Sequence, residues 1–273
     1  NEGNMNYYAG FHRRQGDGFR KSRSRYNVND LTANVTAKVG EKNEWRFFLN
    51  GFTEYSDTPG GLSQAQWEQD PEQSVNPHDF FEARRFSTAI SYKRSFDETN
   101  NLTTSIYGSY LKRDWWLDNR NPVAAKRKFT AALRDIPTVG LFSDYERTNP
   151  LFGKENKLLA GIRLHTDITH EVAVAGDKMG KKAGKTTANS ANTVAVVEGY
   201  VFDEFHITDK LNINPGLRYT FVNYDKEDYF RNNWDNRNED AFIYSLGLFY
   251  KFSEQYRAYA TYSKGYKMPQ IRL

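Results

Sequence analysis

The chain contains no cysteine, which excludes a disulfide framework and thiolate metal sites. It has no run of about 18 apolar residues, so it predicts no transmembrane helix. Its first stretch, NEGNMNYYAG, lacks the basic segment, apolar core and cleavage site of a signal peptide, and it does not begin with Met. We therefore expect residues 1–273 to be an internal piece of a longer protein.

Apolar residues are also scarce, at 38% of the chain, and the mean hydropathy is −0.82. Such a composition leaves little material for a large dry core. Aromatic residues nevertheless reach 15%, with 18 Tyr, 19 Phe and 5 Trp. Because disordered chains are poor in aromatic residues, this balance favours a folded protein with an unusual distribution of apolar surface.

The sequence signals of enzymes are missing as well. No HExxH, Walker or GxSxG pattern occurs. The five His residues are scattered, and His165 and His170 would face opposite sides of a strand. The glycine-rich stretch TPGGLS lies in an expected loop with no helix predicted after it, which argues against a phosphate cradle. We expect no enzyme, no cofactor and no resident metal.

The chain does have long stretches in which apolar and polar residues alternate. In LNINPGLRYTFVNY, every second residue from Leu211 to Phe221 is apolar, and the same holds from Phe242 to Phe252 in AFIYSLGLFYKF. Strands in globular proteins are usually about 5–6 residues long. A tilted strand needs about 9–11 residues to cross a bilayer. The alternation therefore predicts long strands with one face toward lipid and the other toward a wet lumen.

The expected strands are joined by short and long connections in strict alternation. The strands are 5–12, 26–38, 44–54, 82–94, 101–112, 137–148, 157–174, 191–206, 210–222, 240–252 and 255–266. The long connections are 13–25, 55–81, 113–136, 175–190 and 223–239. Outer-membrane barrels have this asymmetry, because their periplasmic turns are short and their outer loops are long. We predict an all-β fold in which residues 1–273 are part of a single transmembrane antiparallel β-barrel domain.

A soluble β-sandwich is the alternative fold, because it also has strands at intervals of about 8–12 residues. Its strands would be shorter, and its long loops would not fall on every second connection. Bacterial barrels close with an even number of strands, so about eleven strands would leave an open and adhesive edge. We therefore expect further strands outside this sequence.

Charge is distributed unevenly among the expected outer loops. Segment 13–25 carries six basic residues and one acidic residue. Segment 112–134 carries seven basic and two acidic residues, and segment 176–189 carries four basic residues and one acidic residue. The segment from Glu54 to Asp79 carries six acids and no Lys or Arg. A basic rim would concentrate anions at the mouth, where Arg can bind carboxylates or phosphates. The alternative is that the basic loops pair with the acidic loop or with anionic lipopolysaccharide.

Aromatic residues lie at the ends of several expected strands, where barrels carry interfacial girdles. We assign most of them to such girdles, with ligand stacking as the alternative for a few. They are Tyr7, Tyr8, Trp45, Phe80, Phe81, Trp115, Trp116 and Tyr266. The Trp115–Trp116 pair is different, because it lies in the same segment as a cluster of Arg and Lys.

Two stretches resemble a known family. PGLRYTFVNY followed by YRAYATYSKGYK is similar to the mid-barrel pattern of TonB-dependent outer-membrane receptors. PGGLSQAQWEQDPEQSVNPHDFFEARR resembles the second outer loop of the ferric dicitrate receptors, where Pro-Gly-Gly-Leu-Ser also leads through an acidic segment and a Gln-Ser to a closing Arg pair. The subgroup resemblance runs from about Tyr7 to Tyr224. It implies a barrel of about 22 strands, of which about 11 are present here.

The resemblance also implies ligand-binding residues, because barrel arginines of ferric dicitrate receptors help to hold the anionic iron–citrate complex. Matching IYGSYLKRDWW and ALRDIPTVGLFSDY to that family assigns Lys112 or Arg113, and Arg134. A third family position falls in the next outer loop, where this chain has only lysines, which lack the planar fork of Arg. Other expected loop contributors are Arg20, the basic residues flanking Ser22, Trp115, Trp116, Lys181 and Lys182.

The function implied by this resemblance is active uptake across the bacterial outer membrane. Ferric citrate or a ferric siderophore would bind above a plug inside the barrel, and TonB would act through a segment absent from this sequence. Iron would be chelated cargo rather than a cofactor, and no nucleic acid is expected as a partner. Two alternatives stay open: a receptor for another siderophore, haem or cobalamin, and a passive anion-selective porin.

Overall fold

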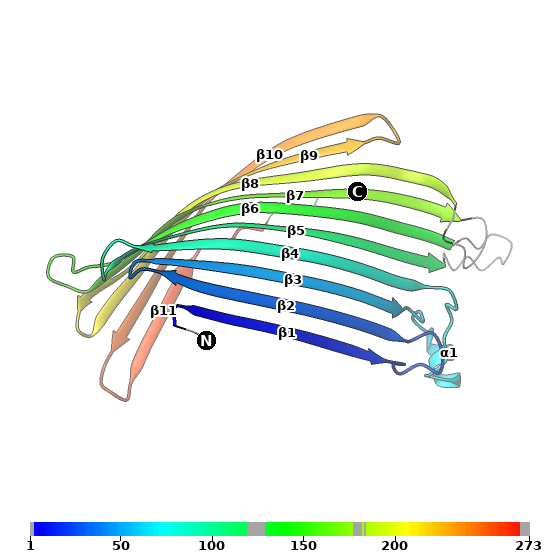
Figure 1. Cartoon of the computed structure of the whole chain (residues 1–273), viewed down its shortest axis with the longest axis horizontal. Helices are drawn as coiled ribbons and strands as arrows, with labels where there is room; N and C mark the ends of the chain where they lie inside the picture. Colours follow the sequence, from blue (N-terminus) through cyan, green and yellow to red (C-terminus); the bar gives the residue numbers. More distant parts are fainter. Residues whose placement is uncertain (1–2, 119–128, 177–181, 183, 268–273) are drawn as a thin grey trace.

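The computed structural model describes residues 3–118, 129–176, 182 and 184–267. These residues form one antiparallel sheet whose eleven strands follow one another in sequence order, and the sheet is twisted and curved (Figure 1). The strands are β1 (Met5–Gly16), β2 (Tyr26–Val39), β3 (Asn43–Asp57), β4 (Phe80–Ser95), β5 (Asn100–Asp118), β6 (Phe129–Thr148), β7 (Asn156–Gly176), β8 (Lys185–Thr208), β9 (Leu211–Asp228), β10 (Asn233–Lys251) and β11 (Arg257–Ser263). This confirms the predicted all-β, partial-barrel architecture.

All eleven expected strands are present, but most extend further at the long-loop end. β5 continues to Asp118, and β6 begins at Phe129. β9 and β10 occupy most of 223–239, so the prediction of a long loop there is wrong. Apolar and polar residues alternate only in the part of a strand that has apolar surroundings on one side. Where both faces meet water, the strands stay paired without an apolar pattern to reveal them.

Short and long connections lie at opposite ends of the sheet. In Figure 1 the turns that follow β2, β4, β6, β8 and β10 gather at one end. The loop that contains the short helix α1 (Gln64–Gln69) lies at the other end. This separation confirms the predicted segregation of the two kinds of connection, except that the connection between β9 and β10, at the long-loop end, is also short.

The helix α1 corrects the expectation that no helix follows TPGGLS. Ser63 is its N-cap: the Ser63 hydroxyl accepts a hydrogen bond from the Gln66 N–H, and the Gln66 side chain accepts one from the Ser63 N–H at 2.9 Å. The Ser-x-x-Gln spacing is that of a capping box, so the signal was present in the sequence. With six residues, the helix is too short to serve as an anion site.

One face of the sheet is apolar across nine successive strands. Residues that are direct register partners form an unbroken row: Tyr7, Val35, Phe47, Ile90, Ile106, Leu141, Leu164, Val197 and Phe221. Most of these side chains are exposed, up to 64% for Tyr7. Water-soluble monomers rarely expose so continuous an apolar surface. We call this side of the sheet the apolar face and the other side the polar face.

The height of the apolar face fits a bilayer. In β10 and the turn after it, apolar side chains recur from Phe242 to Phe252. At about 3.4 Å per residue this is about 34 Å along the strand, which a tilt of about 40° reduces to about 26 Å. The apolar band of outer-membrane barrels is roughly 25 Å tall. The polar face carries side chains such as Asn50, Arg163 and Glu198, as expected for a wet lumen.

A small hydrophobic cluster is buried at the outer ends of β4, β5 and β6. It contains Phe80, Trp116, Phe129 and Ala131. The ring centroids of Trp116 and Phe129 are 5.1 Å apart. Phe80 and Trp116 are only 7% and 4% exposed, so the assignment of Phe80 to an interfacial girdle is wrong, and Trp116, set apart in the sequence as a possible loop contributor, packs in this cluster. They pack against each other because the paired strands continue beyond the apolar rows.

The turn between β4 and β5 is organised by one carboxylate. Asp97 accepts hydrogen bonds from the backbone N–H groups of Thr99 and Asn100, each at 2.8 Å, and from the Thr99 hydroxyl at 2.8 Å. These donors, the Thr99 N–H above all, favour the charged form and lower the pKa of Asp97 to about 2.

We expect Asp97→Ala to destabilise the full-length protein at neutral pH and to have less effect in acid. The folded-state pKa of Asp97 is about 2, below its ordinary value of 3.8. Its stabilising contribution is therefore present above about pH 4 and is lost as the pH falls through about 2. Thermal unfolding of both proteins across this range measures the effect. A difference in Tm that does not shrink in acid would contradict it.

We expect Ile106→Arg to lower the free energy of unfolding of the full-length protein in lipid bilayers by about 2–4 kcal/mol, because it places a charge in the apolar row. Ser109→Arg is the matched control, since Ser109 lies on the polar face of the same strand and should cost much less. Denaturant titration in bilayers measures both. Equal costs for the two variants would show that the faces are assigned incorrectly.

Candidate ligand-binding site

Two arginines lie side by side on the polar face near the outer ends of β5 and β6. Arg113 and Arg134 are direct register partners, so their side chains leave the same face. The Arg134 Nε donates to the carboxylate of Glu171, its partner on β7. The Arg113 Nε is buried and has no hydrogen-bond partner in the described part of the chain. One carboxylate therefore accompanies two guanidinium groups, which leaves capacity for an external anion.

Two aromatic residues border this arginine pair. Phe81 and Trp115 are register partners across β4 and β5, on the same face as Arg113. The Arg113 Cζ lies 5.9 Å from the centroid of the Phe81 ring, within cation–π range. Trp115 is 37% exposed. The position of Phe81 on the polar face corrects its assignment to a lipid-facing girdle, whereas Trp115, set apart in the sequence by its basic neighbours, lies on the same face as Arg113.

Strand alternation separates candidates that are neighbours in the sequence. Lys112 and Trp116 lie an even number of residues from Ile106, so they belong to the apolar face, whereas Arg113 and Trp115 belong to the polar face. Of the two residues matched to the first family position, Arg113 is therefore the one beside Arg134.

The first basic loop is bound to the acidic loop. The Arg20 Nη1 donates to the carbonyl oxygens of Pro71 and Gln73 at 2.6 and 3.0 Å. The Lys21 Nζ lies 2.9 Å from Asp70 Oδ2. This hydrogen bond raises the pKa of Lys21 and lowers the pKa of Asp70. Arg20 therefore serves as a loop clamp in this structure, as the pairing alternative predicts.

The other basic residues that flank Ser22 are also engaged. The carboxylate of Asp57 is buried between Arg23, at 3.8 Å, and Arg25, at 3.3 Å. Most of the charge of this segment is consequently used to hold the first two outer loops together. It adds little to an anion-attracting rim.

Of the four lysines in segment 176–189, the structure describes Lys182 and Lys185, and Lys182 is the one held by contacts with β4. The Lys182 Nζ forms an ion pair with Glu82 at 3.0 Å and lies 4.5 Å from the centroid of the Phe80 ring. Lys182 is therefore held against β4. Lys181 lies outside the described residues.

A hydrogen-bonded chain on the polar face was not evident from the sequence. The Tyr107 hydroxyl lies 2.8 Å from His165 Nδ1, and His165 Nε2 lies 2.9 Å from Asp167 Oδ2. Gly140 separates Tyr107 and His165 in the register, and a Cβ there would lie 2.2 Å from the tyrosine ring. The glycine thus makes room for the contact, and the register would have been needed to find it.

Two further kinds of site are absent from the described ranges 3–118, 129–176 and 184–267. No three His, Asp or Glu side chains there come together as ligands for a metal ion. No helix there is long and apolar enough to cross a membrane.

An antiparallel sheet with one apolar face, a polar lumen side and loops at one end defines part of an outer-membrane-type barrel. The family model for the TonB dependent receptor-like β-barrel matches residues 3–272, so the chain belongs to this family. Among curated proteins, the rhizobactin receptor of Rhizobium meliloti (strain 1021) is 28% identical over 103 residues, which cover 32% of this chain and 14% of that receptor.

Solved structures share the fold at low identity. The unliganded ferric citrate transporter FecA matches 96% of this chain with a TM-score of 0.88 and 18% identity. The open form of the ferric-catecholate import receptor Fiu from E. coli K12 matches 95% of this chain, with a TM-score of 0.77 and 11% identity. The ferric preacinetobactin receptor BauA of Acinetobacter baumannii matches 94% of this chain, with a TM-score of 0.76 and 10% identity. The chain spans 39%, 50% and 42% of these three structures, respectively.

We expect Arg20→Ala to loosen the loop between β3 and β4 in the full-length protein. Each lost charge-assisted hydrogen bond costs roughly 1.5 kcal/mol, so amide hydrogen exchange in this loop should accelerate about tenfold or more. Arg14→Ala is the control, because Arg14 forms no ion pair or side-chain hydrogen bond with other described residues. Equal exchange rates in wild type and Arg20→Ala would exclude the clamp.

Proposed function

We propose that this chain forms part of the barrel of a bacterial outer-membrane receptor that takes up an anionic iron chelate with energy supplied through TonB. The observation that carries the proposal is the Arg113–Arg134 pair at the outer end of the polar face, in which Arg134 is ion-paired to Glu171 and Arg113 has no ion pair with another described residue. Membership of the TonB dependent receptor-like β-barrel family supports it. So do relatives named as receptors for rhizobactin and as a ferric citrate transporter.

The chemistry of the site favours a cargo that carries carboxylates. Guanidinium groups bind planar carboxylates with two parallel hydrogen bonds, and burial strengthens such contacts. Ferric citrate is anionic and rich in carboxylates, so it is the first candidate. Phe81 and Trp115 add aromatic surface beside Arg113, which suits a chelate with less polar parts. Another ferric siderophore is therefore the second candidate.

A passive anion-selective porin would also have cations in its lumen. Family membership favours the receptor, because energy-driven uptake is what TonB dependence means. Binding of a chelate at low concentration is a further difference, since a porin needs only weak attraction to conduct.

We expect Arg113→Gln and Arg134→Gln each to weaken binding of the ferric chelate to the full-length receptor by about tenfold or more. A hydrogen bond to a charged group contributes roughly 1.5–3 kcal/mol, which corresponds to about 10–100-fold in Kd. Lys112→Gln is the matched control, because Lys112 lies on the other face and should leave chelate binding nearly unchanged. Titration with ferric citrate, followed by other ferric siderophores, measures the effect.

Two outcomes would contradict the proposal, and a third would narrow the cargo. If no ferric chelate binds the wild-type receptor, the receptor function is excluded. If ferric citrate alone fails to bind, only the citrate assignment is lost. Iron uptake that persists in cells after removal of TonB would favour the passive porin.

A further inference from the structure

A sharp boundary ends the apolar face on the long-loop side. In β1 to β6 the last largely apolar row of register partners is Phe11, Leu31, Gly51, Phe86, Tyr110 and Pro137. The next row outward is Arg13, Asn29, Thr53, Arg84, Lys112 and Asp135. If the apolar face contacts acyl chains, this second row lies at the level of lipid headgroups.

Within this row, Arg84 and Lys112 are direct register partners and both are exposed. Neither forms an ion pair or a side-chain hydrogen bond with another residue that the structure describes. Like charges that face each other across two strands destabilise a sheet. The pair differs in this from Arg20, Lys21 and Lys182, each of which is held by acceptors within the chain.

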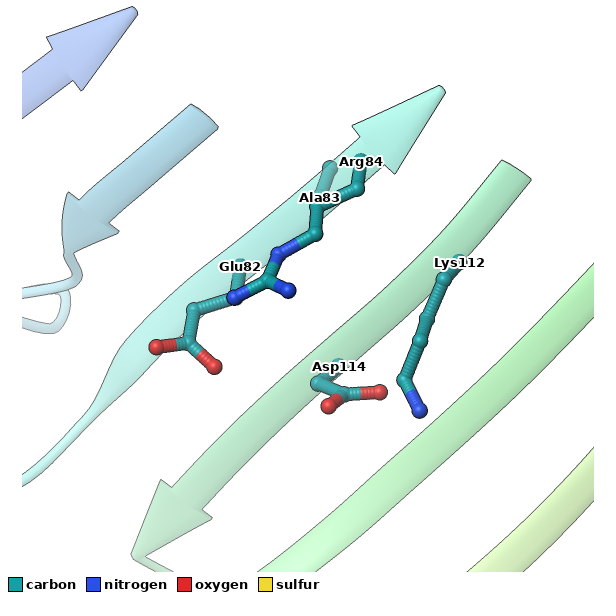
Figure 2. Close-up of a pocket in the computed structure, with 5 residues that line it drawn as sticks. All are labelled: Glu82, Ala83, Arg84, Lys112 and Asp114. Atoms are coloured by element: carbon teal, nitrogen blue, oxygen red, sulfur yellow. The ribbon is translucent and has the colours of Figure 1, made fainter. Parts of the chain in front are cut away.

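Figure 2 shows the surroundings of this cation pair. A surface cavity of about 270 Å³ is lined by Glu82, Ala83, Arg84, Lys112 and Asp114. Outward from Phe86 and Tyr110, the cation pair comes first, and the pair of Glu82 and Asp114 comes one step further along β4 and β5. Figure 2 shows the Lys112 ammonium group beside Asp114 and the Arg84 guanidinium group extending toward Glu82.

The acids near the cavity are not all available to neutralise the cations. Glu82 already forms an ion pair with Lys182 at 3.0 Å. Asp135, the partner of Lys112 on β6, accepts a hydrogen bond from the Tyr110 hydroxyl at 2.6 Å. The Asp114 Oδ1 is buried without a hydrogen-bond partner in the described part of the chain. The cavity thus offers two exposed cations, and Asp114, which lines it, forms no ion pair or side-chain hydrogen bond with another described residue.

We propose that this cavity binds the headgroup of a phosphorylated glycolipid of the outer leaflet. Acyl chains would lie against Phe86 and Tyr110, a phosphate between Arg84 and Lys112, and a sugar hydroxyl would donate to Asp114. Each part of the lipid then meets the chemistry that recognises it: apolar surface, paired cations and a carboxylate acceptor. The inference rests on the membrane location in the proposed function, but not on the identity of the cargo.

Free phosphate has the same anionic group but fits the site less completely. It would satisfy Arg84 and Lys112, but it would leave the adjacent apolar row without a partner. The order of apolar, cationic and acidic rows along β4 and β5 therefore favours the lipid.

The test uses the full-length receptor in detergent, titrated with bisphosphorylated lipid A in mixed micelles. We expect Arg84→Gln combined with Lys112→Gln to weaken lipid binding about tenfold or more, since two charge-assisted contacts are lost. Lys154→Gln combined with Lys210→Gln removes the same charge at the short-turn end and should have no effect. Exchanging the cations, as Arg84→Lys with Lys112→Arg, should retain most of the affinity.

Unchanged lipid affinity in the Arg84→Gln, Lys112→Gln variant would overturn the proposal, as would equal weakening in the control. Dephosphorylated lipid A that binds wild type as tightly would also overturn it, and inorganic phosphate that binds as tightly as the lipid would reassign the site to free phosphate. The same variant should bind the ferric chelate normally. Chelate binding and lipid binding therefore fail independently.

Discussion

In the interior of a membrane, every backbone N–H and C=O group has to find its hydrogen-bond partner within the protein. The antiparallel pairing of neighbouring strands from β1 to β11 meets this requirement along the sheet. Because register partners share a face, the same pairing joins separate alternating strands into one apolar face and one polar face. Both candidate sites depend on it: Arg113 and Arg134 meet on the polar face, and Arg84 and Lys112 meet on the apolar face.

The same requirement is not met at the two edge strands. β1 and β11 each pair on one side only, and every residue of β11 is exposed. Unpaired edges are costly in lipid and promote association in water. This chain spans 39% of FecA, and in a closed barrel both edges would pair with further strands. Binding and stability therefore belong to the full-length protein rather than to this sheet alone.

Much of this architecture could be predicted, because lipid on one side leaves a period of two in the sequence. The apolar runs pair with each other in the structure, from Leu211 opposite Tyr250 to Tyr219 opposite Phe242. The outer strand ends could not be predicted, because water on both faces removes the period. It was predictable in principle that Lys112 and Arg113 lie on opposite faces of the sheet. Lys112 is an even number of residues from Ile106 and Arg113 is an odd number, and side chains alternate between the faces along a strand. Opposite charges suggested that the first basic loop could pair with the acidic loop, but the particular acceptors of Arg20 could not be predicted, because loop conformation follows no such period.

The basic residues show why a charge count alone overestimates a binding site. Arg20 and Lys21 are bound by loop carbonyls and carboxylates, so they stabilise loops rather than attract ligands. Arg113 lies beside Arg134, which is ion-paired to Glu171, and it has no ion pair of its own among the described residues, so it keeps capacity for an anion. Arg84 and Lys112 face outward with no ion pair among the described residues. The formal charge of +4 is compatible with all of these roles, and only the register and the nearest acceptors distinguish them.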